Sequence, residues 1–293
     1  MVTQEHPDLG SVVVMGSSQS GAITQITDSE AVGATRPSIW TGEVALNIYR
    51  LVVVAAFLLA WQLASGHIIS ALAVSRPTAV VAALYHYVGS RSGWIDIRVT
   101  MTEYACGFSI GAVAGLTVAI FLATVKIAGK VFEPIFAALN AIPVIALAPL
   151  FIIIFGLGIW SKVVISAFAV FFIMFWNVYI GAKNLPNGLL NMLRVIGGGR
   201  WDRIRYGIIP GIAPSIFAAV RLAVSVGMLG SVLGEFLVSV AGIGHYIANA
   251  GQQFQTADVL AAIIVVVVIV LSVRGLVILL ERRLTRWQRG SVI

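Results

Sequence analysis

The chain has 293 residues, of which 59% are hydrophobic and only 11% are charged. Soluble globular domains carry roughly 25% charged residues, so this composition excludes an ordinary soluble fold and predicts an integral membrane protein. Nineteen Lys and Arg against twelve Asp and Glu give a net charge of +7. Basic residues of membrane proteins gather beside the spans, so the excess does not indicate a nucleic-acid partner, and we expect none.

Cysteine and histidine are too sparse to suggest a disulfide framework or a metal site. Cys106 is the single cysteine of the sequence, and the four histidines are far apart. An intramolecular disulfide is therefore excluded, and the sequence predicts no metal cluster.

The segment 1–42 differs from the rest of the chain because it is rich in Ser, Thr, Gly, Gln and acidic residues. This composition predicts a disordered tail. Its only apolar stretch, Val12 to Met15, is shorter than the roughly 7–15 apolar residues of a secretory signal. We therefore expect the first membrane helix to stay in the mature protein.

A helix that crosses about 30 Å of hydrocarbon needs about 20 mostly apolar residues. Six segments meet this requirement: 47–65, 104–124, 132–155, 162–182, 211–238 and 259–280. The connection 66–100 contains the stretch PTAVVAALYHYV, Pro77 to Val88, which begins with Pro at a favourable first-turn position. That stretch is too short to span and predicts a short interfacial helix.

Six spans place both ends of the chain on one side, and the basic residues indicate which side. Thirteen Lys and Arg fall in the termini and even-numbered connections, against four on the opposite side. Both termini are therefore expected in the cytoplasm. Arg221 and Arg274 lie inside predicted spans; for Arg274, extension of the side chain to the cytoplasmic interface and a role in a pore both stay open.

The connection between the fourth and fifth spans, Lys183 to Pro214, is long and basic. Apolar residues from Leu189 to Ile196 recur at helical spacing, Gly197–Gly199 interrupt the pattern, and Trp201 begins another. The pattern predicts a helix, a reversal and a second helix on the cytoplasmic side. Composition alone fits both a basic helix on anionic headgroups and a surface that docks a partner.

Several motifs of the chain resemble those of one transporter family. Gly197 and Pro210 have the separation found in the cytoplasmic signature of permease subunits of ATP-binding-cassette (ABC) importers, although Asn191-Met192-Leu193 replaces the usual Glu-Ala-Ala and Gly207 the usual Ile. Other stretches are similar to the nitrate/taurine/sulfonate/bicarbonate branch: Pro143-x-x-Ala146-x-x-Pro149-Leu150, Phe155-Gly156-Leu157-Gly158, Ala213-Pro214-Ser215-Ile216, Gly242-Ile243-Gly244 and Glu281-Arg282-Arg283-Leu284-x-x-Trp287. The resemblance covers about residues 75–289.

The resemblance implies an all-α integral membrane fold of the type I ABC-importer permease, with six transmembrane helices over residues 43–289. It also implies a cytoplasmic coupling helix in the segment of about 183–210, which rests on an ATPase subunit. The residues expected to couple to that ATPase are Asn191, Gly197, Arg200, Trp201, Asp202, Arg203 and Pro210. For Trp201, a role as a membrane-interface aromatic stays open.

The resemblance further implies a set of partners in the bacterial cytoplasmic (inner) membrane. They are a second permease copy, two ABC ATPase subunits, an extracytoplasmic solute-binding protein and the lipid bilayer. The chain has no G-x-x-x-x-G-K-[ST] motif, so we expect ATP and Mg²⁺ on the ATPases and no cofactor on this chain. Candidate docking elements for the binding protein are the helix at 77–88, the turn at 156–162 and the segment 242–246.

Ionisable and polar residues inside spans are candidates for the translocation path. The candidates are Glu103, Asn140, Pro143, Ser231 and Glu235. For Glu235, a hydrogen bond to a neighbouring helix is the structural alternative. Many relatives place Arg where this chain has Glu103 and Asn140, so a path lined by either residue predicts a less anionic or larger organic solute than nitrate or bicarbonate.

The sequence therefore predicts a permease, not an enzyme, that passes a small solute, either nitrate/sulfonate/taurine-like or another small organic compound, into the cytoplasm. A secondary transporter or channel that is not coupled to ATP is the alternative, but the sequence shows no inverted repeat. A membrane enzyme is disfavoured because the sequence contains no clustered His, Asp, Glu and Cys and no G-x-S-x-G motif.

Overall fold

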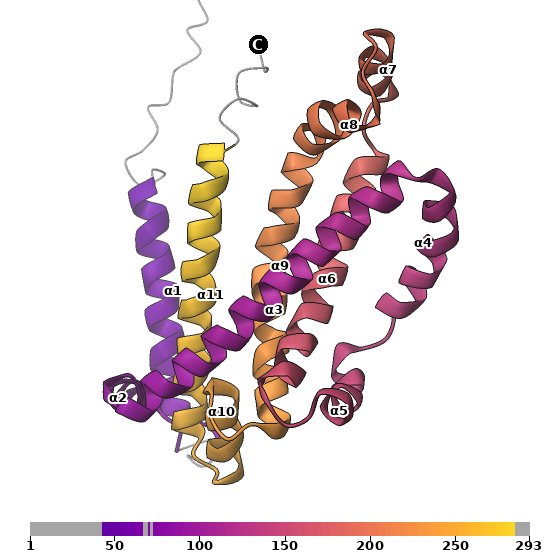
Figure 1. Ribbon diagram of the computed structural model, residues 1–293. Coiled ribbons are helices and arrows are strands. Elements are labelled where there is room, and N and C mark those ends of the chain that lie inside the picture. The colour runs from indigo at the N-terminus through magenta and orange to yellow at the C-terminus, as the bar shows by residue number, and fades with distance from the viewer. Residues whose placement is uncertain (1–42, 67–69, 71–72, 285–293) are drawn as a thin grey trace, which may run out of the picture. The chain divides into compact units, whose positions relative to one another are not determined.

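The computed structural model describes residues 43–66, 70 and 73–284, and the predicted disordered tail 1–42 lies outside them. The chain forms two compact units, residues 1–54 and 55–293, each of which is described by itself. The helices are α1 (Glu43–Ala64), α2 (Pro77–Gly89), α3 (Arg91–Thr124), α4 (Lys126–Asn140), α5 (Val144–Phe155), α6 (Ile159–Lys183), α7 (Asn187–Val195), α8 (Arg200–Asp202), α9 (Ile209–Val238), α10 (Ile243–Gln252) and α11 (Thr256–Leu284). A π-helical turn, Arg203–Ile208, joins α8 to α9 (Figure 1).

The six predicted spans are confirmed as apolar helical segments. Five helices of the described residues are long and apolar enough to cross a membrane, and a bent pair, α4 and α5, makes a sixth span if it counts as one. Within the second unit, α2, α5 and α10 lie toward one end of the long helices and α7 and α8 toward the other (Figure 1). The elements predicted to share one side of the membrane therefore lie at the same end.

The corner between α2 and α3 follows from two local signals. Pro77 occupies the first turn of α2, where a backbone N–H would have no acceptor within the helix, so its absence costs no hydrogen bond. Ser90 accepts a hydrogen bond from the Gly93 backbone N–H at 3.0 Å and so caps α3. Helix α3 therefore begins at Arg91, thirteen residues before the predicted span at 104, because the charged first turns continue the same helix.

The third predicted span, 132–155, is not continuous. Helices α4 and α5 meet at an angle of 94°. Pro143, the N-cap residue of α5, has no N–H to donate and its ring opposes continuation of the preceding helix. The bend leaves Asn140 and Pro143 exposed at the corner.

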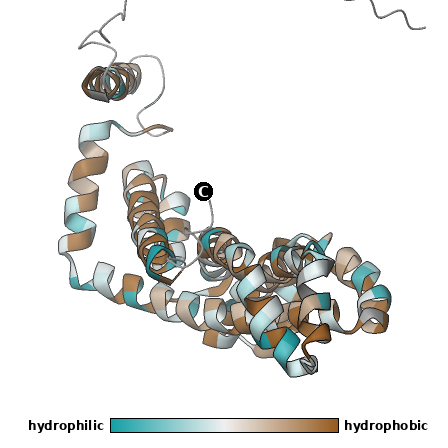
Figure 2. Cartoon of the chain, turned by 90° about the horizontal axis from the view of Figure 1, so that it is seen from above, coloured by the Kyte–Doolittle hydropathy of each residue, from teal (hydrophilic) through white to brown (hydrophobic). Residues whose placement is uncertain are grey.

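The core of the second unit lies where α3, α6 and α9 cross. Buried residues of α6 packed among the three helices include Val170, Met174 and Phe175. Gly107, Gly111 and Gly115, four residues apart on α3, face α6 so closely that a Cβ at any of them would lie within 2.8 Å of an α6 atom. Figure 2 shows apolar residues on the outer sides of the helices as well, as expected of surfaces that face lipid.

The two arginines inside predicted spans lie in different surroundings. Arg221 on α9 forms an ion pair with Glu281 on α11. This pair connects α9 to α11. Arg274 is exposed on α11.

Candidate functional site

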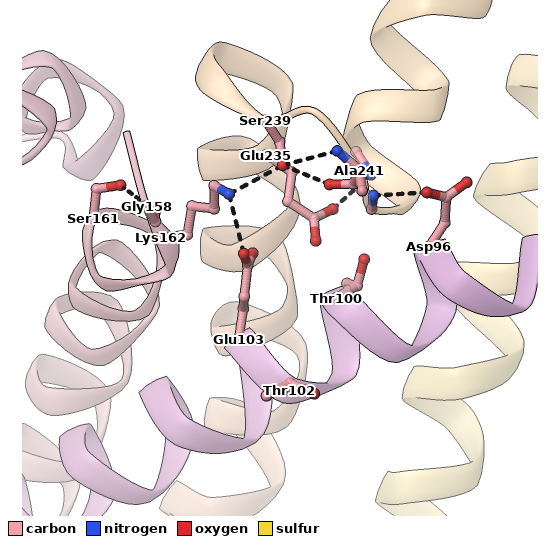
Figure 3. Close-up of polar contacts among 12 residues, drawn as sticks. Asp96, Thr100, Thr102, Glu103, Gly158, Ser161, Lys162, Glu235, Ser239 and Ala241 are labelled. Carbon is pink, nitrogen blue, oxygen red and sulfur yellow. Dashed lines mark hydrogen bonds and ion pairs between the residues drawn. The ribbon is translucent and has the colours of Figure 1, made fainter. Parts of the chain in front are cut away.

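A buried ion pair joins α3 to α6. Lys162 Nζ lies 3.1 Å from Glu103 Oε1 and also donates a hydrogen bond to Ser239 Oγ, at 3.0 Å. Ser239 follows the last residue of α9, so the ammonium group on α6 contacts both α3 and the end of α9 (Figure 3). Lys162 is the first residue of the fourth predicted span, and the pair with Glu103 was not predicted from the sequence.

The N-terminus of α10 is capped by side chains from other helices. Three backbone N–H groups at the start of α10 would otherwise have no partner within the helix. Gly242 N donates to Asp96 Oδ1 at 2.8 Å, Ile243 N to Thr100 Oγ1 at 2.9 Å and Gly244 N to Glu235 Oε2 at 2.7 Å. Glu235 thus makes the kind of structural hydrogen bond left open by the sequence, and α10 is fixed to α3 and α9.

The five candidate path residues fall into two groups. Glu103, Ser231 and Glu235 are buried inside this chain, with exposures of 1%, 0% and 1%. Asn140 and Pro143 are exposed at the bend between α4 and α5. The structure therefore brings Glu103 and Glu235 into one cluster and places the bend residues elsewhere.

The buried cluster has hydrogen-bonding capacity that the described residues do not fill. Three buried oxygen atoms have no hydrogen-bond partner among the described residues: Glu103 Oε2, Glu235 Oε1 and Ser231 Oγ. Asp96, Thr100 and Lys162, which complete the cluster, were missed by sequence reasoning. The available signal was an ionisable residue at the edge of each of three spans, which suggests mutual neutralisation within the membrane.

A pair of stacked tyrosines lies beside this cluster, outside the spanning helices. The rings of Tyr87 on α2 and Tyr246 on α10 stack with their centroids 4.3 Å apart. The Tyr246 hydroxyl donates to Asp258 Oδ1 at 2.7 Å. Burial, followed by this hydrogen bond to a carboxylate, raises the pKa of Tyr246 above its ordinary value of 10.0.

The basic segment between α6 and α9 has the predicted helix, reversal and second helix. Helix α7 ends at Val195, and Gly197 then adopts φ +83°, a conformation that glycine reaches without strain. The Gly198 N–H donates to Leu193 O at 2.9 Å, and the Gly199 N–H donates to Asp202 Oδ2 at the same distance. These bonds fix the reversal that the sequence predicted at 197–199.

The residues predicted to couple to an ATPase lie along this segment. Trp201 is 68% exposed, so its indole is available to a partner or to lipid. Asn191 is also exposed, Arg203 is half-buried, and Pro210 lies in the first turn of α9. Helices α7 and α8 lie at one end of the second unit, beyond the ends of α6 and α9 (Figure 1).

Comparison with known proteins decides the family. Residues 111–286, more than half of the chain, match the family described as "Binding-protein-dependent transport system inner membrane component". The chain belongs to this family. It is thus a multi-pass membrane permease of an ABC importer, of the nitrate/taurine/sulfonate type that the motifs predicted.

Individual relatives of the permease cover most of its length. The riboflavin transport system permease protein RibX of Chloroflexus aurantiacus is 30% identical over 72% of this chain and 79% of its own. The taurine transport system permease protein TauC of Escherichia coli is 26% identical over 78% of this chain and 84% of its own. The nitrate import permease protein NrtB of Synechococcus elongatus is 27% identical over 83% and 92%.

Solved structures agree on the fold of the permease. A crystal structure of a bacterial ABC transporter that imports the polysaccharide alginate aligns with a TM-score of 0.57 and 16% identity, over 84% of this chain and all of the matched chain. At that identity the likeness concerns the fold alone. It confirms the predicted type I permease architecture.

Proposed function

We propose that this permease passes a small solute, delivered by an extracytoplasmic binding protein, into the cytoplasm, and that two partner ATPase subunits drive the passage. It acts as a homodimer in the bacterial inner membrane with both termini in the cytoplasm. ATP and Mg²⁺ bind to the ATPases, and this chain has no catalytic activity of its own. The observation that carries the proposal is the exposed basic segment with its reversal at Gly197.

The surface of that segment suits a protein partner. An exposed aromatic side chain beside basic residues is typical of the residues that dominate interface energetics. Trp201 and Arg205 are both exposed, and the short helices on either side of Gly197 hold the segment at one end of the spans. A movement of the segment is transmitted directly to α6 and α9, which it connects.

For the solute we propose a chemical class and not a single compound. The relatives named above carry riboflavin, taurine and nitrate in their names. A small solute, nitrate/sulfonate/taurine-like or another small organic compound, is therefore our proposal. Glu103 does not bear on the charge of that solute as the sequence suggested, because its carboxylate is buried and paired with Lys162.

Association with the ATPase tests the proposed function. The full-length permease is co-expressed with its ATPase subunit and purified through a tag on the permease. We expect Gly197→Arg and Arg200→Glu to abolish co-purification, while Arg98→Glu, a charge reversal near the other end of the spans, leaves it unchanged. Equal recovery of the ATPase with both segment variants would count against the assignment and favour transport without ATP.

A further inference from the structure

A hollow of about 300 Å³ lies between α6 and α9, at the end of α6 that leads into the basic segment. Four of its lining residues come from α6, between Trp176 and Gly181, a fifth is Asn184, which follows α6, and two come from α9, Ser215 and Ala218. The volume is at the lower end of the roughly 300–1,000 Å³ typical of small-molecule sites.

The lining is polar without being charged. Asn177, Asn184 and Ser215 contribute amide and hydroxyl groups, and none of the seven lining residues is ionisable. Polar groups in membrane-spanning helices face protein or water because lipid cannot satisfy them. This face of α6 and α9 is therefore expected to border the translocation path.

The cation nearest to the lining in sequence is engaged elsewhere. Lys183, one residue before Asn184, contacts both carboxylate oxygens of Glu133 on α4 at 3.1 Å each. An anion in the hollow would give up hydration without gaining a counter-charge from the lining, which is costly. The hollow therefore disfavours nitrate and sulfonates.

Two lining residues retain unused hydrogen-bonding capacity. The Trp176 Nε1–H donor is buried and has no partner among the described residues. Asn177 Nδ2 donates to Ile173 O at 2.8 Å, which leaves the amide oxygen as an acceptor. Because that indole N–H is itself buried, a solute in the hollow meets the Asn177 amide oxygen as an acceptor and the Ser215 hydroxyl as a donor, beside the Trp176 ring.

Gly181 lets α6 approach α9 closely at the edge of the hollow. A Cβ at this position would lie 2.3 Å from Ser215 Oγ. Any larger residue would therefore push against the hydroxyl group that lines the α9 side.

We propose that this hollow binds the transported solute and selects an uncharged, planar molecule that carries both a hydrogen-bond donor and an acceptor, such as a nitrogen heterocycle. The proposal rests on the proposed function and deepens it by naming the solute class. Stacking on Trp176 and hydrogen bonds to Asn177 and Ser215 provide the recognition. A solute as small as nitrate would leave most of the lining without contact.

Direct binding tests this site in the complex of full-length permease and ATPase, reconstituted in lipid nanodiscs. Saturation-transfer NMR is recorded with cytosine and lumichrome as uncharged planar probes and with taurine and butanesulfonate as sulfonate probes. We expect both heterocycles to bind, and at least tenfold weaker binding to Trp176→Leu and Asn177→Leu. The matched controls Trp94→Leu and Asn47→Leu, far along the chain from the hollow, should bind within twofold of wild type.

Several results would overturn the proposal. They are binding of the sulfonates but not of the heterocycles, heterocycle binding that the two hollow variants leave unchanged, and no binding of any probe. If Asn177→Leu does not fold, Ser215→Ala, which removes a single oxygen, replaces it and should weaken binding at least threefold; unchanged binding would also overturn the proposal.

The ATPase separates this proposal from the proposed function. If the ATPase co-purifies and its activity responds to the binding protein while the hollow binds no heterocycle, the solute class is wrong and the transport function stands. If no ATPase co-purifies with the wild-type permease but the heterocycles bind at Trp176 and Asn177, the hollow is a site and the proposed coupling fails.

Discussion

Glu103 and Lys162 form an ion pair in which both side chains are withdrawn from solvent, with exposures of 2% and 7%. The pair does not stand alone, because the Glu103 and Glu235 carboxyl groups are close enough to interact. The buried ionisable groups of the cluster are therefore two acids and one base, since Asp96 is only half-buried. This imbalance makes the two members of the pair unequal in their effect on stability.

We predict that Lys162→Met destabilises the permease more than Glu103→Gln. Loss of the ammonium group leaves two buried carboxyl groups without a counter-charge. Removing one partner of a buried ion pair typically lowers the free energy of unfolding by about 3–5 kcal/mol. Loss of the Glu103 charge leaves one acid and one base in the cluster, and a smaller effect follows. Unfolding midpoints of the purified variants in detergent measure the difference, and an equal or larger effect of Glu103→Gln would refute the unequal arrangement.

Position 242 requires glycine because of its backbone conformation and the closeness of Glu235. It has φ +116°, and a Cβ would lie 2.4 Å from the Glu235 carboxyl carbon. We expect Gly242→Ala to destabilise the permease by about 1–3 kcal/mol through backbone strain, and further by displacing Glu235 from the Gly244 N–H.

Gly251→Ala is the matched control for this prediction. Gly251 lies near the end of the same helix, and a Cβ there would meet no atom within 4 Å. The unfolding midpoint and the ATPase stimulation by the binding protein are compared for both variants. Equal behaviour of the two would show that the start of α10 tolerates a side chain.

The contact between α3 and α6 depends on the glycines of α3. A Cβ at Gly111 would lie 2.4 Å from the Ala167 carbonyl oxygen, a backbone atom that moves only with the helix. Gly111→Ala is therefore expected to destabilise the permease by about 1–3 kcal/mol through overpacking. Gly275→Ala on α11 meets nothing within 4 Å and should instead stabilise the helix by about 0.5–1 kcal/mol. Thermal unfolding that shows the same sign for both variants would contradict this account.

Much of the fold follows from local sequence patterns. The apolar segments, the short helix that begins at Pro77 and the reversal at Gly197 were all predictable because period, proline and glycine act on neighbouring residues. The early start of α3 was missed because Arg91, Asp96 and Arg98 lower the hydropathy of its first turns although they remain helical. The angle at Pro143 depends on how α5 packs on α6, which the sequence does not encode locally.

The charge cluster was less accessible to sequence reasoning. Glu103 and Glu235 were recognisable as acids within spans, but their partners lie far along the chain. No spacing rule links Lys162 to Glu103, since the two helices meet only through tertiary packing. The family resemblance was more informative about function than about this site, because it concerned sequence motifs and not which side chains contact one another.

The stability of the permease is expected to depend on pH through the stacked tyrosines. Burial raises the pKa of Tyr87, and burial with the hydrogen bond to Asp258 raises that of Tyr246. Below about pH 9 both phenols are protonated in the folded and the unfolded chain, so they do not make the free energy of unfolding depend on pH. Above it the unfolded chain loses its protons first and binds fewer than the folded chain, so the free energy of unfolding falls as pH rises.

Tyr246→Phe isolates this contribution. At pH 7.5 the variant lacks one hydrogen bond to a carboxylate, worth about 1.5–3 kcal/mol, and should unfold at a lower temperature than wild type. Between pH 9.5 and 11 its unfolding midpoint should fall less steeply, because one phenol that resists ionisation in the folded chain has been removed. Unfolding curves of the two proteins that fall in parallel over this range would show that Tyr246 ionises equally easily in both states, contrary to the burial and hydrogen bonding seen at α10.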